Sequence, residues 1–310
     1  MRKISPIALV CLICLCILIV PAAQARTWHV PSDVLTVTEA IALAESGDVI
    51  ELAVGVHKIT GREHVLKPGL IIRSDTGMPG GVVLKECACY CGDWRDRPVF
   101  VVDRAGDPVR FEGLRFKDFT LSCGPFPTIG NPIFHVTDGS VKFTDCRFEN
   151  LWKTAVWFDG GVGHFRGCTF ENGCGCAGAI HFDGQRLFLT DCRFEQFHWL
   201  NDGQELAGNI LQLVSGEIEL NRVIFADNGP LIELVTVGAD AELNAYSSCF
   251  VDNATMWEGV VAGRAVLDCC SIDPVLWNVV DGGELMIIGD DTKAATIEQT
   301  TLSAVKSLFR

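Results

Sequence analysis

Three ten-residue stretches of the chain repeat one phrase: VKFTDCRFEN at 141–150, GHFRGCTFEN at 163–172 and LFLTDCRFEQ at 187–196. In each phrase an apolar residue is followed three positions later by cysteine and five positions later by phenylalanine. A helix would place apolar residues about 3.6 positions apart over ten or more residues, and these segments do not. The phrase therefore indicates short strands that repeat at a fixed period.

The same spacing recurs outside the three phrases, with other apolar residues in place of cysteine or phenylalanine. Further copies are Phe111/Leu114/Phe116, Leu220/Val223/Phe225 and Leu267/Cys270/Ile272, and a looser copy is Leu243/Tyr246, where the last apolar residue slips to Phe250. Segments 123–132 and 198–209 lengthen two of the intervals and are interpreted as loops inserted into coils of about two dozen residues.

Turn residues recur in phase with the phrase. Asp-Gly or Ser-Gly precedes most copies and asparagine follows several, as at Asn150, Asn172, Asn228 and Asn253. Each coil is thus predicted to hold three short strands, and equivalent residues of adjacent coils would stack about 4.8 Å apart. Cys146, Cys168 and Cys192 would form one buried ladder beside a Phe148, Phe170 and Phe194 ladder. The cysteines are interpreted as small apolar fillers, not as disulfides or metal ligands.

With these repeats the chain resembles secreted bacterial right-handed parallel β-helix proteins of the pectin-lyase-like superfamily. Segment 27–59 is similar to the entry segment of that group, and Thr36 with Glu39 forms a capping box for a short helix. Segment TFENGCGCAGAI at 169–180 resembles the repeats of polymorphic outer-membrane proteins. The resemblance implies an all-β fold, a right-handed parallel β-helix, but leaves activity open because the fold hosts many functions.

The domain organisation follows from the ends of the repeat. We expect a signal peptide at 1–25, an N-terminal cap and first strands at 26–60, a parallel β-helix at 61–290 and a C-terminal cap or tail at 291–310. The tail TLSAVKSLFR at 301–310 has a helical apolar stripe, which favours a cap over a sorting tag.

Charge restricts the partners. The whole chain carries a net charge of −14, with 25 basic and 39 acidic residues; removal of the signal takes two basic residues, so the mature charge is 23 − 39 = −16. An acidic exported chain repels nucleic acid and anionic membrane surfaces. We expect a monomer that is secreted, periplasmic or associated with the cell surface, without a transmembrane anchor after signal removal. Its partner would be an extracellular polysaccharide or a surface protein.

The best candidate surface is the outer face of the strand before each Asp-Gly corner. Period-two alternation directs one residue of each strand outward, which gives a row of His135, Trp157, His181, Gln212 and Glu233 on successive coils. His135, His181 and Glu233 are the candidate proton carriers, and Trp157 is a candidate for stacking on a sugar. The alternative is that outward positions of a half-exposed sheet are simply polar.

Other aromatic and charged residues are candidates for binding. The corner after the phrase is predicted to carry an aromatic strip suited to glycans or a protein partner, formed by Trp152, Trp199, Trp257 and Trp277. The alternative is that these tryptophans cover the core, which fits Trp277 better. Arg95 and Arg97 could bind a sugar carboxylate.

Asp138, Asp159 and Asp183 would stack as like charges, and calcium would relieve their repulsion, although turn-forming aspartate is commoner. No other cofactor is indicated. Cys87, Cys89 and Cys91, and Cys174 with Cys176, lack the spacing of common zinc sites and suggest loop disulfides.

Two functional hypotheses remain open. The first is a non-catalytic module that binds glycans or proteins, because the repeats are strong and the catalytic signatures are weak. The second is a polysaccharide lyase or glycoside hydrolase that acts on acidic polysaccharides through the outward row. The paired aspartates and Gly-His-Gly turn of pectin-hydrolysing relatives are missing from the sequence.

Overall fold

The computed structural model describes residues 24–77, 80–86, 97–119, 132–151, 153–173, 178–198, 209–229, 231–272, 276–280, 282–288 and 295–297. Several predictions concern residues outside these ranges. They are the signal peptide up to residue 23, the loop cysteines Cys87, Cys89, Cys91, Cys174 and Cys176, the tail helix at 301–310, and the candidates Arg95, Trp152 and Trp199.

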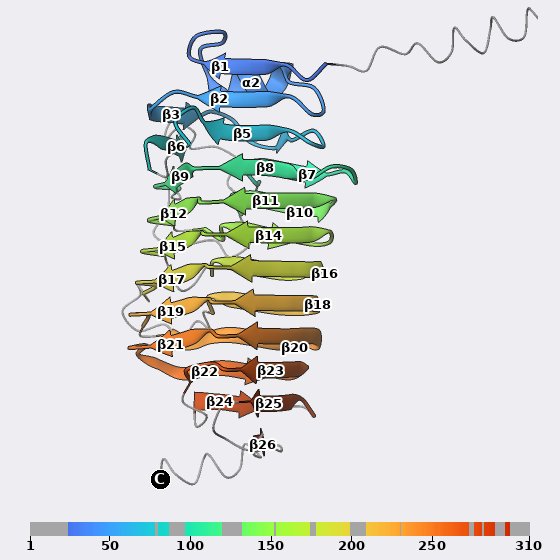
Figure 1. Ribbon diagram of the computed structural model, residues 1–310, viewed down its shortest axis with the longest axis vertical. Coiled ribbons are helices and arrows are strands. Elements are labelled where there is room, and N and C mark those ends of the chain that lie inside the picture. The colour runs from blue at the N-terminus through green and yellow to red at the C-terminus, as the bar shows by residue number, and fades with distance from the viewer. Residues whose placement is uncertain are drawn as a thin grey trace, which may run out of the picture.

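The chain winds into a stack of coils, and each complete coil contributes one strand to each of three faces (Figure 1). Face 1 consists of β4 (His64–Val65), β7 (Phe100–Asp103), β10 (Phe134–Asp138), β13 (Val156–Phe158), the first parts of β16 (Ile180–Thr190), β18 (Leu211–Asn221) and β20 (Leu231–Tyr246), β22 (Thr255–Val261) and β24 (Trp277–Val279).

Face 2 consists of β1 (Thr27–Val30), β2 (Val49–Leu52), β5 (Ile71–Ser74), β8 (Val109–Glu112), β11 (Ser140–Thr144), β14 (Val162–Arg166), the second parts of β16, β18 and β20, β23 (Arg264–Asp268) and β25 (Glu284–Ile288). Face 3 consists of β3 (Gly55–Ile59), β6 (Val82–Glu86), β9 (Leu114–Lys117), β12 (Arg147–Glu149), β15 (Thr169–Glu171), β17 (Arg193–Glu195), β19 (Ile224–Ala226) and β21 (Cys249–Val251). Neighbouring strands pair in parallel within all three faces, as the repeat predicts.

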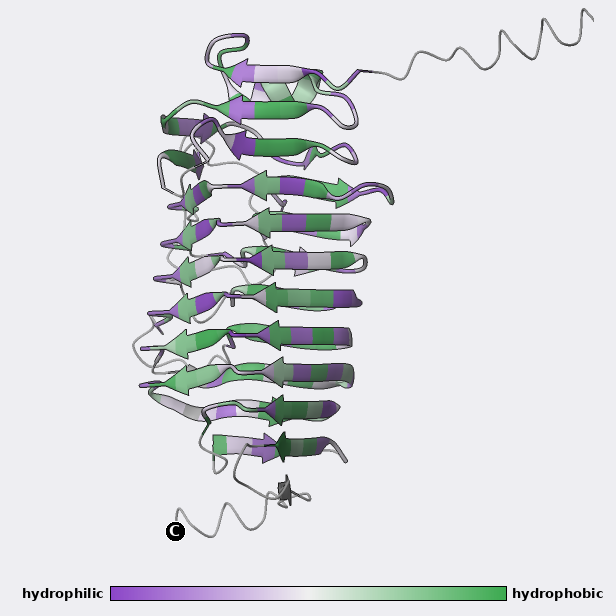
Figure 2. Ribbon diagram, in the orientation of Figure 1, coloured by the Kyte–Doolittle hydropathy of each residue, from purple (hydrophilic) through white to green (hydrophobic). Residues whose placement is uncertain are grey.

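The phenylalanine ladder is confirmed and is longer than the sequence analysis proposed. Phe148 stacks on Phe170 with ring centroids 4.6 Å apart, and Phe170 stacks on Phe194 at 4.7 Å. Phe116 extends the ladder at one end, and Phe225 and Phe250 extend it at the other. Each such pair adds about 0.5–1.5 kcal/mol beyond its buried area. Apolar and polar residues alternate along the strands in Figure 2, so one side of each strand lines this shared core.

The cysteine ladder is also confirmed, and its thiols are free. Each thiol donates a weak hydrogen bond to the carbonyl two residues earlier, across a corner residue with positive φ. In this way Cys146 Sγ lies 3.4 Å from the oxygen of Thr144, and Asp145 between them has φ 51°. The ladder position therefore selects a small side chain that also carries a donor.

One copy of the phrase lies in a different register from the predicted one. Ala245, Ser248 and Phe250 stack on Leu220, Val223 and Phe225 and keep the +3 and +5 spacing, so there is no slip at Phe250. Ser248 is fully buried, and its hydroxyl donates to the carbonyl of Tyr246 at 3.1 Å, as the cysteines do in other coils. This copy was not recognised from the sequence because the small residues Ala245 and Ser248 stand where the other copies have larger apolar residues or cysteine.

The asparagines after the phrase have two roles. Asn150 and Asn172 adopt the left-handed conformation, with φ 56° and 52°, as predicted. In a later coil the equivalent left-handed residue is Asp227, and the asparagine comes one position after it, where Asn228 is buried. Its buried amide donates to the main-chain oxygen of Phe194 at 3.1 Å. At this position asparagine satisfies a buried main-chain carbonyl.

The two ends of the stack differ. Helix α2 (Val37–Leu43) packs beside β1, β2 and β3, and the Thr36 side chain accepts the main-chain N–H of Glu39 at 3.1 Å, which confirms the predicted cap. At the other end β26 (Ala295–Ile297) pairs antiparallel with β25. Because an antiparallel strand cannot continue the coil, β26 ends the regular stack on face 2.

Candidate functional site

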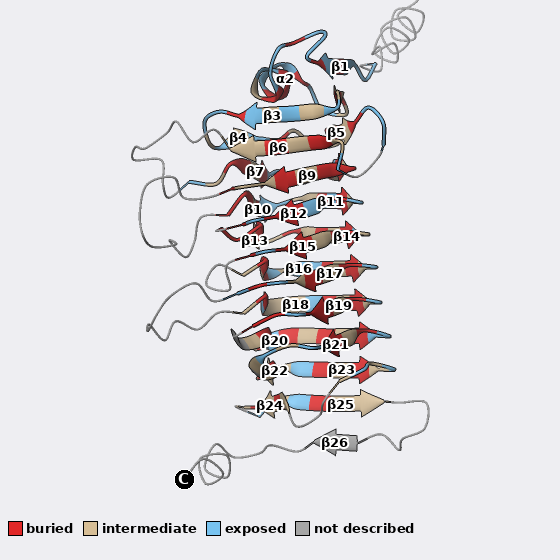
Figure 3. Cartoon of the chain, turned by 90° about the vertical axis from the view of Figure 1, so that its left-hand side faces the viewer, coloured by how far each residue is buried: buried red, intermediate tan, exposed pale blue. Residues whose placement is uncertain are grey.

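The outward row predicted on face 1 is present over four coils. His135 pairs in register with Trp157, Trp157 with His181, and His181 with Gln212. The strands β10, β13, β16 and β18 that carry them follow one another along the stack in Figure 3. His135, Trp157 and His181 are half-buried, and Gln212 is exposed.

Glu233 does not belong to this row, which corrects the prediction. Gln212 pairs with Thr236 on β20. Glu233 lies three residues before Thr236 on the same strand and pairs with Trp257 of β22. The physical reason lies at the corner that leads into face 1. There two successive residues point inward, as Leu234 and Val235 do, and this breaks the period-two alternation used to place Glu233.

Asp159 joins His135 to Trp157. Its Oδ2 lies 2.7 Å from His135 Nε2, and its Oδ1 accepts the indole N–H of Trp157 at 2.7 Å. Partial burial opposes ionisation of this carboxyl, but the hydrogen bonds from His135 and Trp157 prevail and lower the pKa of Asp159. The carboxylate orients both rings, so a neutral His135 is held with Nδ1 as its basic atom.

His181 is held by two other contacts. Its Nδ1 lies 2.9 Å from Gln212 Oε1, and its ring stacks on the indole of Trp157 at a centroid distance of 3.8 Å. An N–H at Nδ1 donates to the amide oxygen and leaves Nε2 of the neutral ring as a base. Since His181 covers one face of the Trp157 ring, that face is not open for stacking on a sugar.

Glu233 lies beside the row in a drier environment. Burial raises the pKa of its carboxyl, while a hydrogen bond with Thr236 opposes the shift. The hydroxyl of Thr236 also accepts from Asn209 Nδ2 at 2.7 Å. Glu233 therefore holds a proton to higher pH than an exposed glutamate.

The three aspartates proposed as calcium ligands do not converge. Asp138 pairs in register with Asp103 and accepts from the N–H of Gly139, and Asp183 accepts from the hydroxyl of Ser215 at 2.5 Å. Asp159 is engaged by His135 and Trp157, as described above. Within the described ranges, no group of three His, Cys, Asp or Glu side chains is arranged to hold a metal ion.

The described aromatic and arginine candidates lie apart from the row. Trp257 is on strand β22, not in a corner as predicted, because the chain enters face 1 before reaching it. Trp277 is buried, and its indole N–H donates to Glu258 at 3.2 Å, in line with a core position. Arg97 forms an exposed ion pair with Glu63 at 2.6 Å.

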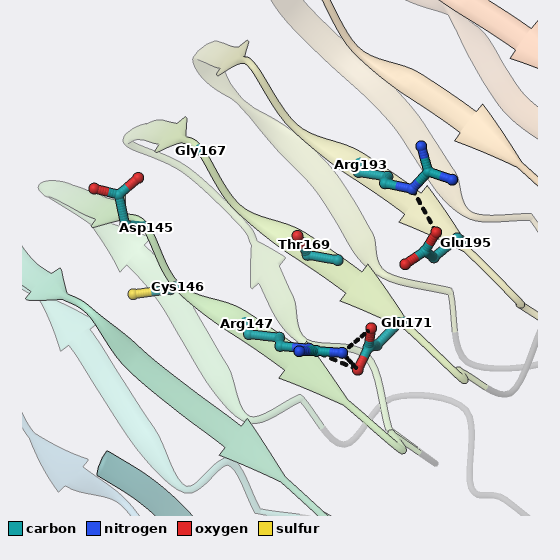
Figure 4. A pocket seen from close by; sticks show the side chains of 8 residues that line it. All are labelled: Asp145, Cys146, Arg147, Gly167, Thr169, Glu171, Arg193 and Glu195. Atoms are coloured by element: carbon teal, nitrogen blue, oxygen red, sulfur yellow. Dashed lines mark hydrogen bonds and ion pairs between the residues drawn. The ribbon is translucent and has the colours of Figure 1, made fainter. Parts of the chain in front are cut away.

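Face 3 carries a second, charged surface that the sequence analysis missed. It has a hollow of about 280 Å³ around Thr169, with Arg147 paired to Glu171 and Arg193 paired to Glu195 (Figure 4). The sequence feature that could have predicted this surface is the recurring Arg-Phe-Glu of the phrase. In it, a basic and an acidic residue flank an inward-pointing phenylalanine. Since its charges pair with one another, this surface is less suited to chemistry than face 1.

Comparisons with known proteins identify the fold. The chain is similar to the pectin methylesterase PemA from Erwinia chrysanthemi, with 13% identity, a TM-score of 0.54 and coverage of 93% of this chain and 95% of that one. The two chains share the parallel β-helix fold, which confirms the fold class predicted from the repeats. No protein-family model and no curated protein matches the sequence.

Two further solved structures match over most of this chain. A pectin methylesterase from Aspergillus niger has 14% identity, a TM-score of 0.49 and coverage of 89% and 92%. The PL6 family alginate lyase AlyGC, as its R241A mutant, has 14% identity, a TM-score of 0.48 and coverage of 84% of this chain and 40% of that one. Among the described residues, no helix is long and apolar enough to cross a membrane.

Proposed function

We propose that the protein is an exported enzyme that cleaves a polysaccharide, as a lyase or a glycoside hydrolase, on face 1. The observation that carries the proposal is the in-register set of His135, Trp157 and His181, in which each imidazole is oriented by its own partner. Fixed tautomers are what general acid–base catalysis needs, because a base must present a defined lone pair to the substrate.

The roles divide by electrostatic environment. His181 acts as the base through Nε2, and Asp159 stays ionised and positions His135. Glu233, whose carboxyl keeps its proton longer because it is partly buried, is the candidate acid. Lyases and hydrolases both use a base together with an acid for the leaving oxygen, so this pair of roles would serve either reaction.

The shared fold supports a polymeric substrate. A parallel β-helix offers equivalent positions on successive coils, and PemA is by its name a pectin-modifying enzyme. The aspartates along face 1 would repel an acidic polymer, whereas a glycan bearing no charge would meet no such repulsion.

The decisive experiment incubates the purified protein with pectate, alginate and a neutral glucan, each with and without calcium. Ultraviolet absorbance of unsaturated products identifies a lyase, and reducing ends without that absorbance identify a hydrolase. The expected result is activity that His181→Ala lowers by about 100-fold or more. Activity unchanged in His181→Ala and in Asp159→Asn would exclude this site, and binding without turnover in the wild type would favour the non-catalytic module.

A further inference from the structure

Three charged side chains meet in the interior where face 3 passes to face 1. Arg62 lies between β3 and β4, Glu86 ends β6, and Lys153 lies between β12 and β13. Lys153 Nζ lies 3.1 Å from Glu86 Oε2, and Arg62 Nη2 pairs with Glu86 Oε1. The Lys153 side chain is fully buried and that of Arg62 is only 9% exposed.

With Lys153 protonated, this cluster carries a net charge of +1. Two cations share a single carboxylate, and Arg62 Nη1 is buried without a hydrogen-bond partner in the described part of the chain. The two residues that follow Arg62 do not supply an acceptor. Glu63 is engaged by Arg97, and His64 Nε2 donates to the main-chain carbonyl of Thr60 at 2.9 Å. A buried guanidinium N–H without an acceptor is costly, because nothing replaces the water it loses.

The protonation of Lys153 reflects the same imbalance. Burial, with a smaller contribution from the charge of Arg62, lowers the pKa of Lys153 to about 7. At neutral pH the lysine is therefore partly uncharged, and Arg62 and Glu86 balance each other. A second acceptor with a negative charge would satisfy Arg62 Nη1 and stabilise the protonated lysine together.

We propose that the Arg62–Glu86–Lys153 cluster binds one small monovalent anion, a halide or a carboxylate, and that Lys153 takes up one proton when the anion binds. The anion accepts from Arg62 Nη1 and from the protonated amine, so that two cations face two negative charges. The site is independent of the catalytic proposal, since none of its residues belongs to the row on face 1.

Thermal unfolding tests the proposal, with sodium bromide or sodium formate exchanged against the salt of a bulky sulfonate at constant ionic strength. The midpoint should rise with the small anion in a saturable way at pH 6. The apparent affinity should fall about tenfold per pH unit above pH 7, because only the protonated lysine is competent to bind. Lys153→Met should lose the response, and Lys142→Met, which removes an exposed lysine on β11, should keep it.

A second measurement does not depend on any variant. Calorimetry of formate binding to the wild type at pH 7.5, in two buffers of different ionisation enthalpy, should show proton uptake. Galacturonate and its neutral counterpart galactose show whether the carboxylate can come from a sugar acid. If the unfolding midpoint rises with galacturonate and not with galactose, a sugar acid can occupy the site. If neither sugar raises the midpoint, the site takes only small free anions. An equal anion response in Lys153→Met, or binding without proton uptake, would overturn the proposal.

Discussion

The imidazole of His181 lies face to face with the indole of Trp157, with ring centroids 3.8 Å apart and an angle of 21° between the planes. The stack comes from adjacent coils, so it exists only because β13 and β16 are in register. It fixes the ring of His181 while Gln212 fixes its tautomer. A residue held in this way costs little further ordering when it transfers a proton.

His181→Ala should therefore lower kcat on the polysaccharide that the activity screen identifies by about 100-fold or more, the usual contribution of a positioned base. Steady-state kinetics measures the change. The matched control is His164→Ala, which removes the stack of His164 on Phe188 at 4.8 Å on face 2. Equal losses in both variants would mean that the effect is structural.

Asp159→Asn tests the carboxylate that links His135 and Trp157. The pKa of Asp159 is lowered in the folded protein, so its contribution to stability is fully present above the unfolded pKa of about 3.9 and disappears as pH falls through the lower folded pKa. Because the side chain is 50% exposed, the loss at pH 7 should be below about 1 kcal/mol. Urea unfolding at pH 7 and pH 2.5 measures it. A difference from the wild type that does not shrink as the pH is lowered from 7 would contradict this origin.

The core repeat was predictable because a translational stack must place the same residue type over itself. The repeat is visible in the sequence as Phe148, Phe170 and Phe194, which stack on one another in the structure. The predicted position of Glu233 in the outward row was wrong because two successive residues at the corner, Leu234 and Val235, both point inward. This breaks the inward–outward alternation along the strand, and a short sequence pattern does not show where such a break occurs. The charged cluster was missed for another reason: Glu86 and Lys153 are 67 residues apart and have no periodic signature.

Ser248→Ala tests the buried corner donor in the coil where serine replaces cysteine. The Ser248 hydroxyl accepts the main-chain N–H of Val223 at 3.1 Å and donates to Tyr246. Alanine leaves a buried N–H without its acceptor, so the free energy of unfolding should fall by about 1–3 kcal/mol. Chemical denaturation measures this loss. Ser248→Cys, which restores the donor found at Cys168 and Cys192, should recover part of it, and no recovery would contradict the role assigned to the ladder.

Glu86→Gln tests the counter-charge of the interior cluster. The change leaves Arg62 and Lys153 buried with no carboxylate between them, and removing one partner of a buried pair typically costs about 3–5 kcal/mol. Urea unfolding at pH 6 should show a loss of this size, and a smaller one at pH 9, where Lys153 is neutral. The exposed pair of Arg222 and Asp191 supplies the control, since Asp191→Asn should change stability little at either pH.

Lys153→Met should stabilise the protein at acidic pH, since it removes a cation that is buried with Arg62 and one carboxylate. The pKa of Lys153 is about 7 when folded and about 10.4 when unfolded, so between these values the unfolded chain binds more protons. Wild-type stability should accordingly rise with pH from about 7 to 10 by up to about 1 kcal/mol per unit, while that of the variant stays flatter. Urea unfolding across this range, in a buffer free of halide and small carboxylates, measures the two slopes. Parallel slopes would show that Lys153 keeps an ordinary pKa and that its burial carries no electrostatic cost.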